Sequence, residues 1–79
     1  MDAKLKFEYD RKGDILYINT RPPYPEQNSE ELTDNVIVRM NPKTGIIENV
    51  EVLFFSTRLL REDLFELPVI AQLKLADSD

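Results

Sequence analysis

The chain has 79 residues, a formal net charge of −5 at pH 7, and no histidine, cysteine or tryptophan. This length makes one small domain with a thin hydrophobic core. Without cysteine and histidine, thiol and imidazole catalysis are excluded, and the usual ligands of zinc and copper are missing. We therefore expect no cofactor. The acidic balance argues against nucleic acids and membrane surfaces as partners, because both attract basic proteins.

No segment has the pattern of a membrane span or a secretory signal. The longest apolar run, Val52–Phe55, is far too short to cross a bilayer. The residues that follow Met1 lack the apolar core of a signal peptide. We therefore expect a cytoplasmic protein.

A first β-hairpin is predicted near the N-terminus. Residues 5–9 alternate between apolar and charged side chains, and residues 15–20 are rich in β-branched and aromatic ones. Between them, Asp10 suits the first position of a turn, and Gly13 suits a left-handed conformation. The pattern therefore predicts strand, turn and strand.

The side chains of this hairpin are assigned to faces by its register. The turn favours a register in which Asp10 pairs with Asp14. This register places Leu16 and Ile18 on the face opposite to Tyr9. A shift by one residue would move both side chains to the other face.

Residues 21–34 are predicted to form a loop, because prolines cannot donate to a strand ladder and the following residues are polar. A second hairpin is expected over residues 35–55. Its turn is the segment Asn41–Gly45, in which Gly45 can become left-handed.

A short amphipathic helix is predicted over residues 57–67, where leucines recur at helical spacing before Pro68. Residues 69–75 alternate again and fit either a fifth strand or an arm, and residues 76–79 form a frayed tail. The chain is thus one domain, 1–79, of the α+β class. We expect a small antiparallel sheet of two hairpins, with four or five strands and the helix packed on one face.

The first hairpin carries a Tyr-Asp pair, a glycine-containing turn and the run Asp14-Ile15-Leu16-Tyr17-Ile18, and the second contains Gly45 to Val52. This pattern resembles a family of small prokaryotic domains, the domain of unknown function 2283. The resemblance extends from Phe7 to about Leu67. It implies a small β-rich fold and no particular activity.

Two acidic residues are candidates for a small polar site. Asp10 and Asp14 could form an acidic pocket for a hard cation or for acid–base chemistry. Their spacing does not match a calcium loop, and aspartate also favours turns through local hydrogen bonds. That both aspartates serve only to form the turn therefore remains an alternative to the acidic pocket.

Several apolar residues fall on the face opposite to the predicted core, and one short helix cannot cover both faces of a sheet. Small domains often compensate for a thin core by oligomerising. We therefore predict a non-enzymatic module that forms a homodimer. The predicted interface consists of Leu16, Ile18, Phe55, Leu60 and Leu64.

Two other functions stay open. The acidic chain could be a regulatory protein that masks a basic protein partner, as antitoxins do. A more distant alternative is a carboxylate enzyme or divalent-ion binder built on Asp10 and Asp14.

Overall fold

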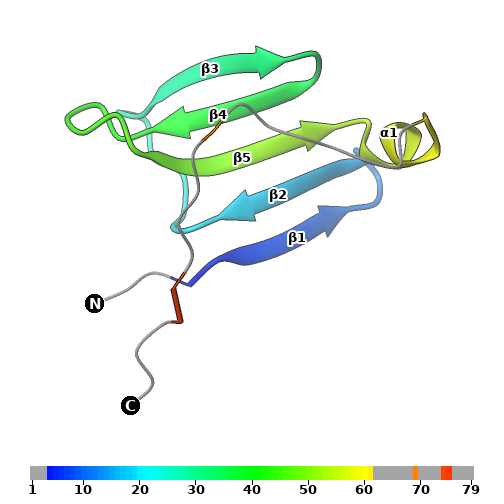
Figure 1. Ribbon diagram of the computed structural model, residues 1–79, viewed down its shortest axis with the longest axis horizontal. Helices are drawn as coiled ribbons and strands as arrows, with labels where there is room; N and C mark the ends of the chain where they lie inside the picture. The colour runs from blue at the N-terminus through cyan, green and yellow to red at the C-terminus, as the bar shows by residue number, and fades with distance from the viewer. Residues whose placement is uncertain (1–3, 62–68, 70–73, 76–79) are drawn as a thin grey trace.

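The computed structural model describes residues 4–61, 69, 74 and 75. They form one antiparallel sheet followed by a short helix (Figure 1). The predicted α+β class is confirmed. No helix in these ranges is long and apolar enough to cross a bilayer. The elements are β1 (Lys6–Asp10), β2 (Ile15–Asn19), β3 (Asn28–Thr33), β4 (Val36–Met40), β5 (Ile47–Leu53) and α1 (Phe55–Arg61).

The strands are arranged in the order β1-β2-β5-β4-β3. Strands β3, β4 and β5 follow each other as a meander, and β2 pairs with β5 after a long connection, which makes a Greek key. The two edges of the sheet are therefore β1 and β3, while β5 lies at its centre (Figure 1).

The fifth strand is β3, which lies inside the segment predicted to be a loop. The loop prediction for residues 28–33 is wrong, because this polar strand is an edge strand that pairs only with β4. An exposed edge strand needs no apolar alternation, so its sequence carries little signal. In the segment 69–75, where a fifth strand was one expectation, the described residues are not part of a strand, and the others lie outside the described residues.

The predicted register of the first hairpin is wrong by one residue. Tyr9 lies opposite Leu16 and Phe7 opposite Ile18. The turn is longer than predicted because Asp14, and not Gly13, adopts the left-handed conformation, with φ of 55°. As a result, Leu16 and Ile18 lie on the same face as Tyr9.

The second hairpin turn follows the prediction. Gly45 is left-handed, with φ of 75°, and its amide donates to the Asn41 carbonyl over 2.8 Å. The side chain of Asn41 accepts hydrogen bonds from the amides of Lys43 and Thr44.

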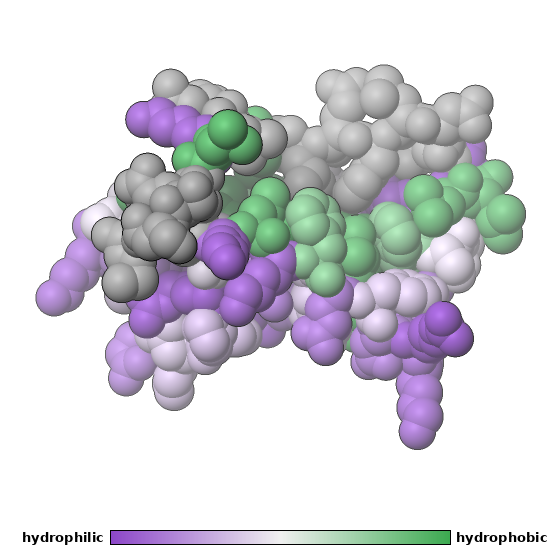
Figure 2. Space-filling model, turned by 90° about the horizontal axis from the view of Figure 1, so that it is seen from below, coloured by the Kyte–Doolittle hydropathy of each residue, from purple (hydrophilic) through white to green (hydrophobic). Residues whose placement is uncertain are grey.

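One face of the sheet is apolar and the other is polar. Val36, Val38 and Val52 lie on the apolar face and are the fully buried apolar side chains of the described residues. Cross-strand neighbours extend this face over Val50 and over the β1–β2 hairpin. Figure 2 views the molecule from the β1 edge and shows hydrophobic side chains in a band above hydrophilic ones.

The described part of α1 lies beyond the end of β5 (Figure 1). The sequence predicts a helix over a face of the sheet, whereas Phe55–Arg61 extend from its end, and residues 62–68 lie outside the described residues. Val69, farther along the chain, lies against the apolar face, where it lines hollows together with Ile47 and Val50.

Candidate functional site

The carboxylate of Asp14 connects the first hairpin to the start of α1. Its Oδ1 accepts hydrogen bonds from the Tyr9 hydroxyl at 2.6 Å and from the Ser56 amide at 3.0 Å. Its Oδ2 accepts one from the Ser56 hydroxyl at 2.8 Å. The Phe55 amide donates to the Asp14 carbonyl at 3.0 Å. We call Tyr9, Asp14 and Ser56 the hairpin–helix clasp.

The charges of the clasp follow from these hydrogen bonds. The Tyr9 hydroxyl, followed by the Ser56 amide and hydroxyl, lowers the pKa of Asp14. The same hydrogen bond from Tyr9 to Asp14 raises the pKa of the tyrosine. Asp14 is therefore an ionised acceptor at neutral pH and a weaker base than an ordinary carboxylate. This geometry suits the fastening of a helix end better than the activation of the Ser56 hydroxyl.

Asp10 and Asp14 accept hydrogen bonds from different parts of the chain. Oδ1 of Asp10 turns back onto its own turn and accepts the amides of Lys12 at 3.1 Å and Gly13 at 3.3 Å. A Cβ on Gly13 would lie 3.0 Å from Oδ2 of Asp10 and 3.2 Å from Cδ1 of Ile15, so a larger residue here would crowd both side chains. Within residues 4–61, 69, 74 and 75, no three carboxylates gather into a set that could hold a metal ion.

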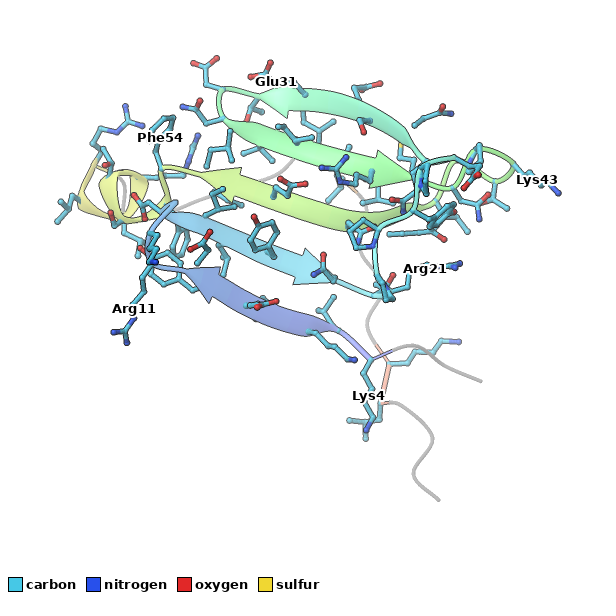
Figure 3. All side chains as sticks on the ribbon, turned by 180° about the vertical axis from the view of Figure 1, so that it is seen from behind. Lys4, Arg11, Arg21, Glu31, Lys43 and Phe54 are labelled. Atoms are coloured by element: carbon cyan, nitrogen blue, oxygen red, sulfur yellow. The ribbon has the colours of Figure 1, made fainter. Side chains whose placement is uncertain are left out.

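A second polar cluster fastens the proline-rich connection to the end of the sheet. The Tyr24 hydroxyl and the Gln27 amide donate to Oε1 of Glu48 at 2.7 and 2.9 Å. These two donors lower the pKa of Glu48, Gln27 contributing most, and the hydrogen bond to Glu48 raises the pKa of Tyr24. The Arg21 guanidinium lies 4.5 Å from the centre of the Tyr24 ring. Figure 3 shows Arg21 at the end of the sheet opposite to Arg11.

Asn49 is the buried polar residue of this cluster, with 1% of its surface exposed. Its Oδ1 accepts from Gln27 at 2.8 Å, and its Nδ2 donates to Asn19 Oδ1 at 2.9 Å and to the Arg21 carbonyl at 2.6 Å. Sequence reasoning missed Asn49. The available signal was an asparagine inside an otherwise apolar and charged strand.

The polar face also carries a cross-strand ion pair. Arg39 on β4 contacts Glu51 on β5 at 2.5 Å and donates to the Ser29 hydroxyl on β3 at 3.0 Å. This pair and the cluster around Asn49 connect the polar side chains of the central strands to one another, while the buried Nε of Arg39 makes no hydrogen bond among the described residues.

These residues coincide with the region that a family model recognises. The model of a protein of unknown function, DUF2283, matches residues 6–56. The chain belongs to the DUF2283 family. No curated protein and no solved structure matches the chain. The matched region of this DUF2283 protein begins with β1 and ends at Ser56, so it contains the complete hairpin–helix clasp.

Two of the predicted interface residues, Leu16 and Ile18, lie on the apolar face of this DUF2283 protein, next to β1. Leu16 and Ile18 are partly buried on β2, and the Phe55 ring meets the Tyr9 ring edge-on at 6.0 Å. Leu60 on α1 is 89% exposed. Leu64 lies outside the described residues. Leu16, Tyr9 and Phe55 therefore form one continuous path from the sheet to the helix.

Next to this path, three apolar side chains along the outer strand remain open to solvent. Leu5 is 46% exposed, Phe7 64% and Tyr9 43%. We call these residues the β1 border. The alternation of residues 5–9 was the sequence signal that these three side chains share one face.

Proposed function

We propose that this DUF2283 protein is a small non-enzymatic interaction module that forms a homodimer through the β1 side of its apolar face. The observation that carries the proposal is the exposed β1 border, defined above, which adjoins the buried valines of the same face. Contiguous exposed apolar surface of this kind usually marks an interface. A single sheet with three fully buried valines among the described residues gains stability from a second layer or a second copy.

The interface would combine the β1 border with the residues behind it. Leu16 and Ile18 support the border from β2, and Phe55 continues it through the Tyr9 ring. Leu60, 89% exposed on α1, and Leu64, four residues further along the sequence, complete the proposed set.

The polar clusters support a binding role over a catalytic one. The carboxylates with lowered pKa values, Asp14 and Glu48, are held by hydrogen bonds from within the chain. A catalytic base needs a raised pKa and access to a substrate. We expect flat thermal-shift traces with divalent ions and nucleotides, and a stabilising response to any of them would contradict the non-enzymatic proposal.

The native mass tests the homodimer. Light scattering after size-exclusion chromatography, over a dilution series, should give twice the chain mass of 9.2 kDa at high concentration. Phe7→Asp should favour the monomer, because it introduces a charge into the β1 border at a 64% exposed position without disturbing the core. The matched control is Ile46→Asp, 64% exposed in the turn before β5, which should keep the wild-type mass. A wild-type monomer at every concentration would refute the proposal.

A second candidate is the regulatory binding of a basic protein, and the acidic β3 edge favours it. Glu30 and Glu31 are exposed on this strand, and the net charge of the chain is −5. Copurification of one basic protein from the native host, lost in Glu30→Lys and kept in Lys6→Glu, would support this candidate. Both candidates assume a cytoplasmic location, which cell fractionation tests.

A further inference from the structure

The two edges of the sheet differ in how well they can accept another strand. On β3, Glu30 lies opposite Val38 and so takes a position on the apolar face. The register also shifts between Glu31 and Thr33. A charge on the apolar side and a bulge are devices that keep sheet edges from pairing.

The β1 edge has neither of these features. Its register with β2 is unbroken from Lys6 to Asp10, and all five residues are exposed. Figure 1 shows the outer side of β1 free of other strands. In front of β1, Lys4 and Leu5 continue the same alternation.

The charges along this edge are complementary to those of the same segment aligned in the opposite direction. Residues 4–10 read Lys-Leu-Lys-Phe-Glu-Tyr-Asp, with positive charges before Phe7 and negative charges after it. Phe7 and Tyr9 lie on the apolar face, opposite Ile18 and Leu16. The charged residues between them therefore belong to the polar face.

We propose that β1 pairs antiparallel with β1 of a second copy of this chain, with the two Phe7 residues opposite each other at the twofold axis. Lys6 then faces Glu8 of the second copy, and Lys4 faces Asp10. On the apolar side, Leu5 faces Tyr9. The two sheets become one continuous sheet, and this inference rests on the proposed homodimer and specifies its geometry.

Other registers are less favourable for a simple reason. Residues that lie opposite each other in an antiparallel pair point to the same face of the sheet. The twofold axis therefore always passes through a residue, and each alternative register places it at another residue of the strand. An axis at Lys6 or at Glu8 brings like charges together. An axis at Tyr9 puts Glu8 opposite Asp10. Since like charges in direct opposition are unfavourable, the axis at Phe7 is preferred.

A charge-swap experiment tests the pairing. Lys6→Glu and Glu8→Lys change exposed positions and leave the β1 border intact. Each variant alone should raise the dimer dissociation constant at least tenfold, because each puts two pairs of like charges in opposition. An equimolar mixture should restore a heterodimer, measured by native mass spectrometry after circular dichroism has confirmed the fold of both variants.

The outcomes separate the two proposals. If wild type is a dimer and both variants keep its dissociation constant, the edge pairing is wrong and the homodimer stands. If wild type is a monomer throughout, both proposals fail. If the variants dissociate but the mixture does not associate, the pairing of Lys6 with Glu8 is wrong.

Disulfide trapping tests the register, because the chain contains no cysteine. Phe7→Cys should form a covalent dimer under mild oxidation, since the two residues lie at the axis. Leu5→Cys is the matched control on the same face; its two copies would be about 13 Å apart along the strands, too far for a disulfide. Equal trapping of both variants, or trapping of Leu5→Cys alone, would overturn the Phe7 axis.

Discussion

The two faces of the sheet are stabilised by different interactions and leave different groups unsatisfied. On the polar face, hydrogen bonds around Glu48 and Asn49 and the ion pair of Arg39 with Glu51 join the side chains of neighbouring strands. On the apolar face, Val38 and Val52 are fully buried, whereas the β1 border remains open. Among the described residues, the central side chains of the polar face are joined by hydrogen bonds within the chain, whereas the β1 border of the apolar face is exposed.

This difference indicates on which face the binding of a partner is more favourable in free energy. A ligand on the polar face would have to displace hydrogen bonds that the chain already makes, and each costs free energy to break. A partner on the apolar face only removes hydrophobic surface from water, which is favourable. We therefore expect a partner to bind at β1 and the start of α1. The following substitutions test the difference between the two faces.

The largest loss of stability is expected on the apolar face. Val52→Ala removes two methyl groups from a fully buried side chain at the centre of the sheet and should lower the free energy of unfolding by about 2–3 kcal/mol. Urea unfolding measures the change. Val69→Ala, a partly buried change at the border of the same face, should cost less. Equal costs would contradict the valine-centred core.

The next largest effect is expected on the polar face. Asn49→Ala removes three hydrogen bonds and should cost about 1–3 kcal/mol, because Gln27 and Asn19 lose their partner near the buried position. Amide hydrogen exchange should rise in residues 20–27, which Asn49 holds. Asn28→Ala, at an exposed position of β3, is the control and should leave both quantities unchanged.

A change that affects neither face provides a reference. Gly45→Ala should cost about 1 kcal/mol, because alanine disfavours the φ of 75°. Open space around the added methyl group excludes a steric contribution. Thermal unfolding measures the loss, and a stability gain would mean that the turn relaxes to another conformation.

The smallest effect is the pH dependence of the clasp, since its charges are exposed. The pKa of Asp14 is lowered from 3.8 in the folded state, so its contribution to stability is present above this value and is lost as the pH falls through the folded pKa. Asp14→Asn should therefore flatten the acid limb of the stability curve. The raised pKa of Tyr9 acts in the opposite sense, and its contribution is lost as the pH rises past its ordinary value of 10.0. Urea midpoints from pH 2.5 to 7 test the acid limb, and parallel curves would contradict this role of Asp14.

Local sequence patterns were sufficient to predict several elements of the fold. The Asn41–Gly45 turn followed from proline and glycine chemistry, and its left-handed glycine is observed. The two strands of the first hairpin, β1 and β2, followed from alternation and from β-branched residues. The candidate interface residues Leu16 and Ile18 were identified as apolar, but they were placed on the wrong face.

The remaining features could not be predicted because they depend on distant contacts. Asp14 is left-handed while its carboxylate holds Ser56, 42 residues away, and this one residue shifts the register of the first hairpin. Strand β3 has a polar sequence that becomes a strand only because β4 offers a free edge.

The sequence by itself determined the class of the fold, the Asn41–Gly45 turn and the self-complementary charge pattern of residues 4–10, since these depend on neighbours in the chain. The tertiary structure decided the register of the first hairpin, the fifth strand and the difference between the hydrogen-bonded polar face and the exposed β1 border of the apolar face. The physical reason is that the side-chain period of a strand is two residues, so one distant contact at Asp14 assigns every residue of the hairpin to a face.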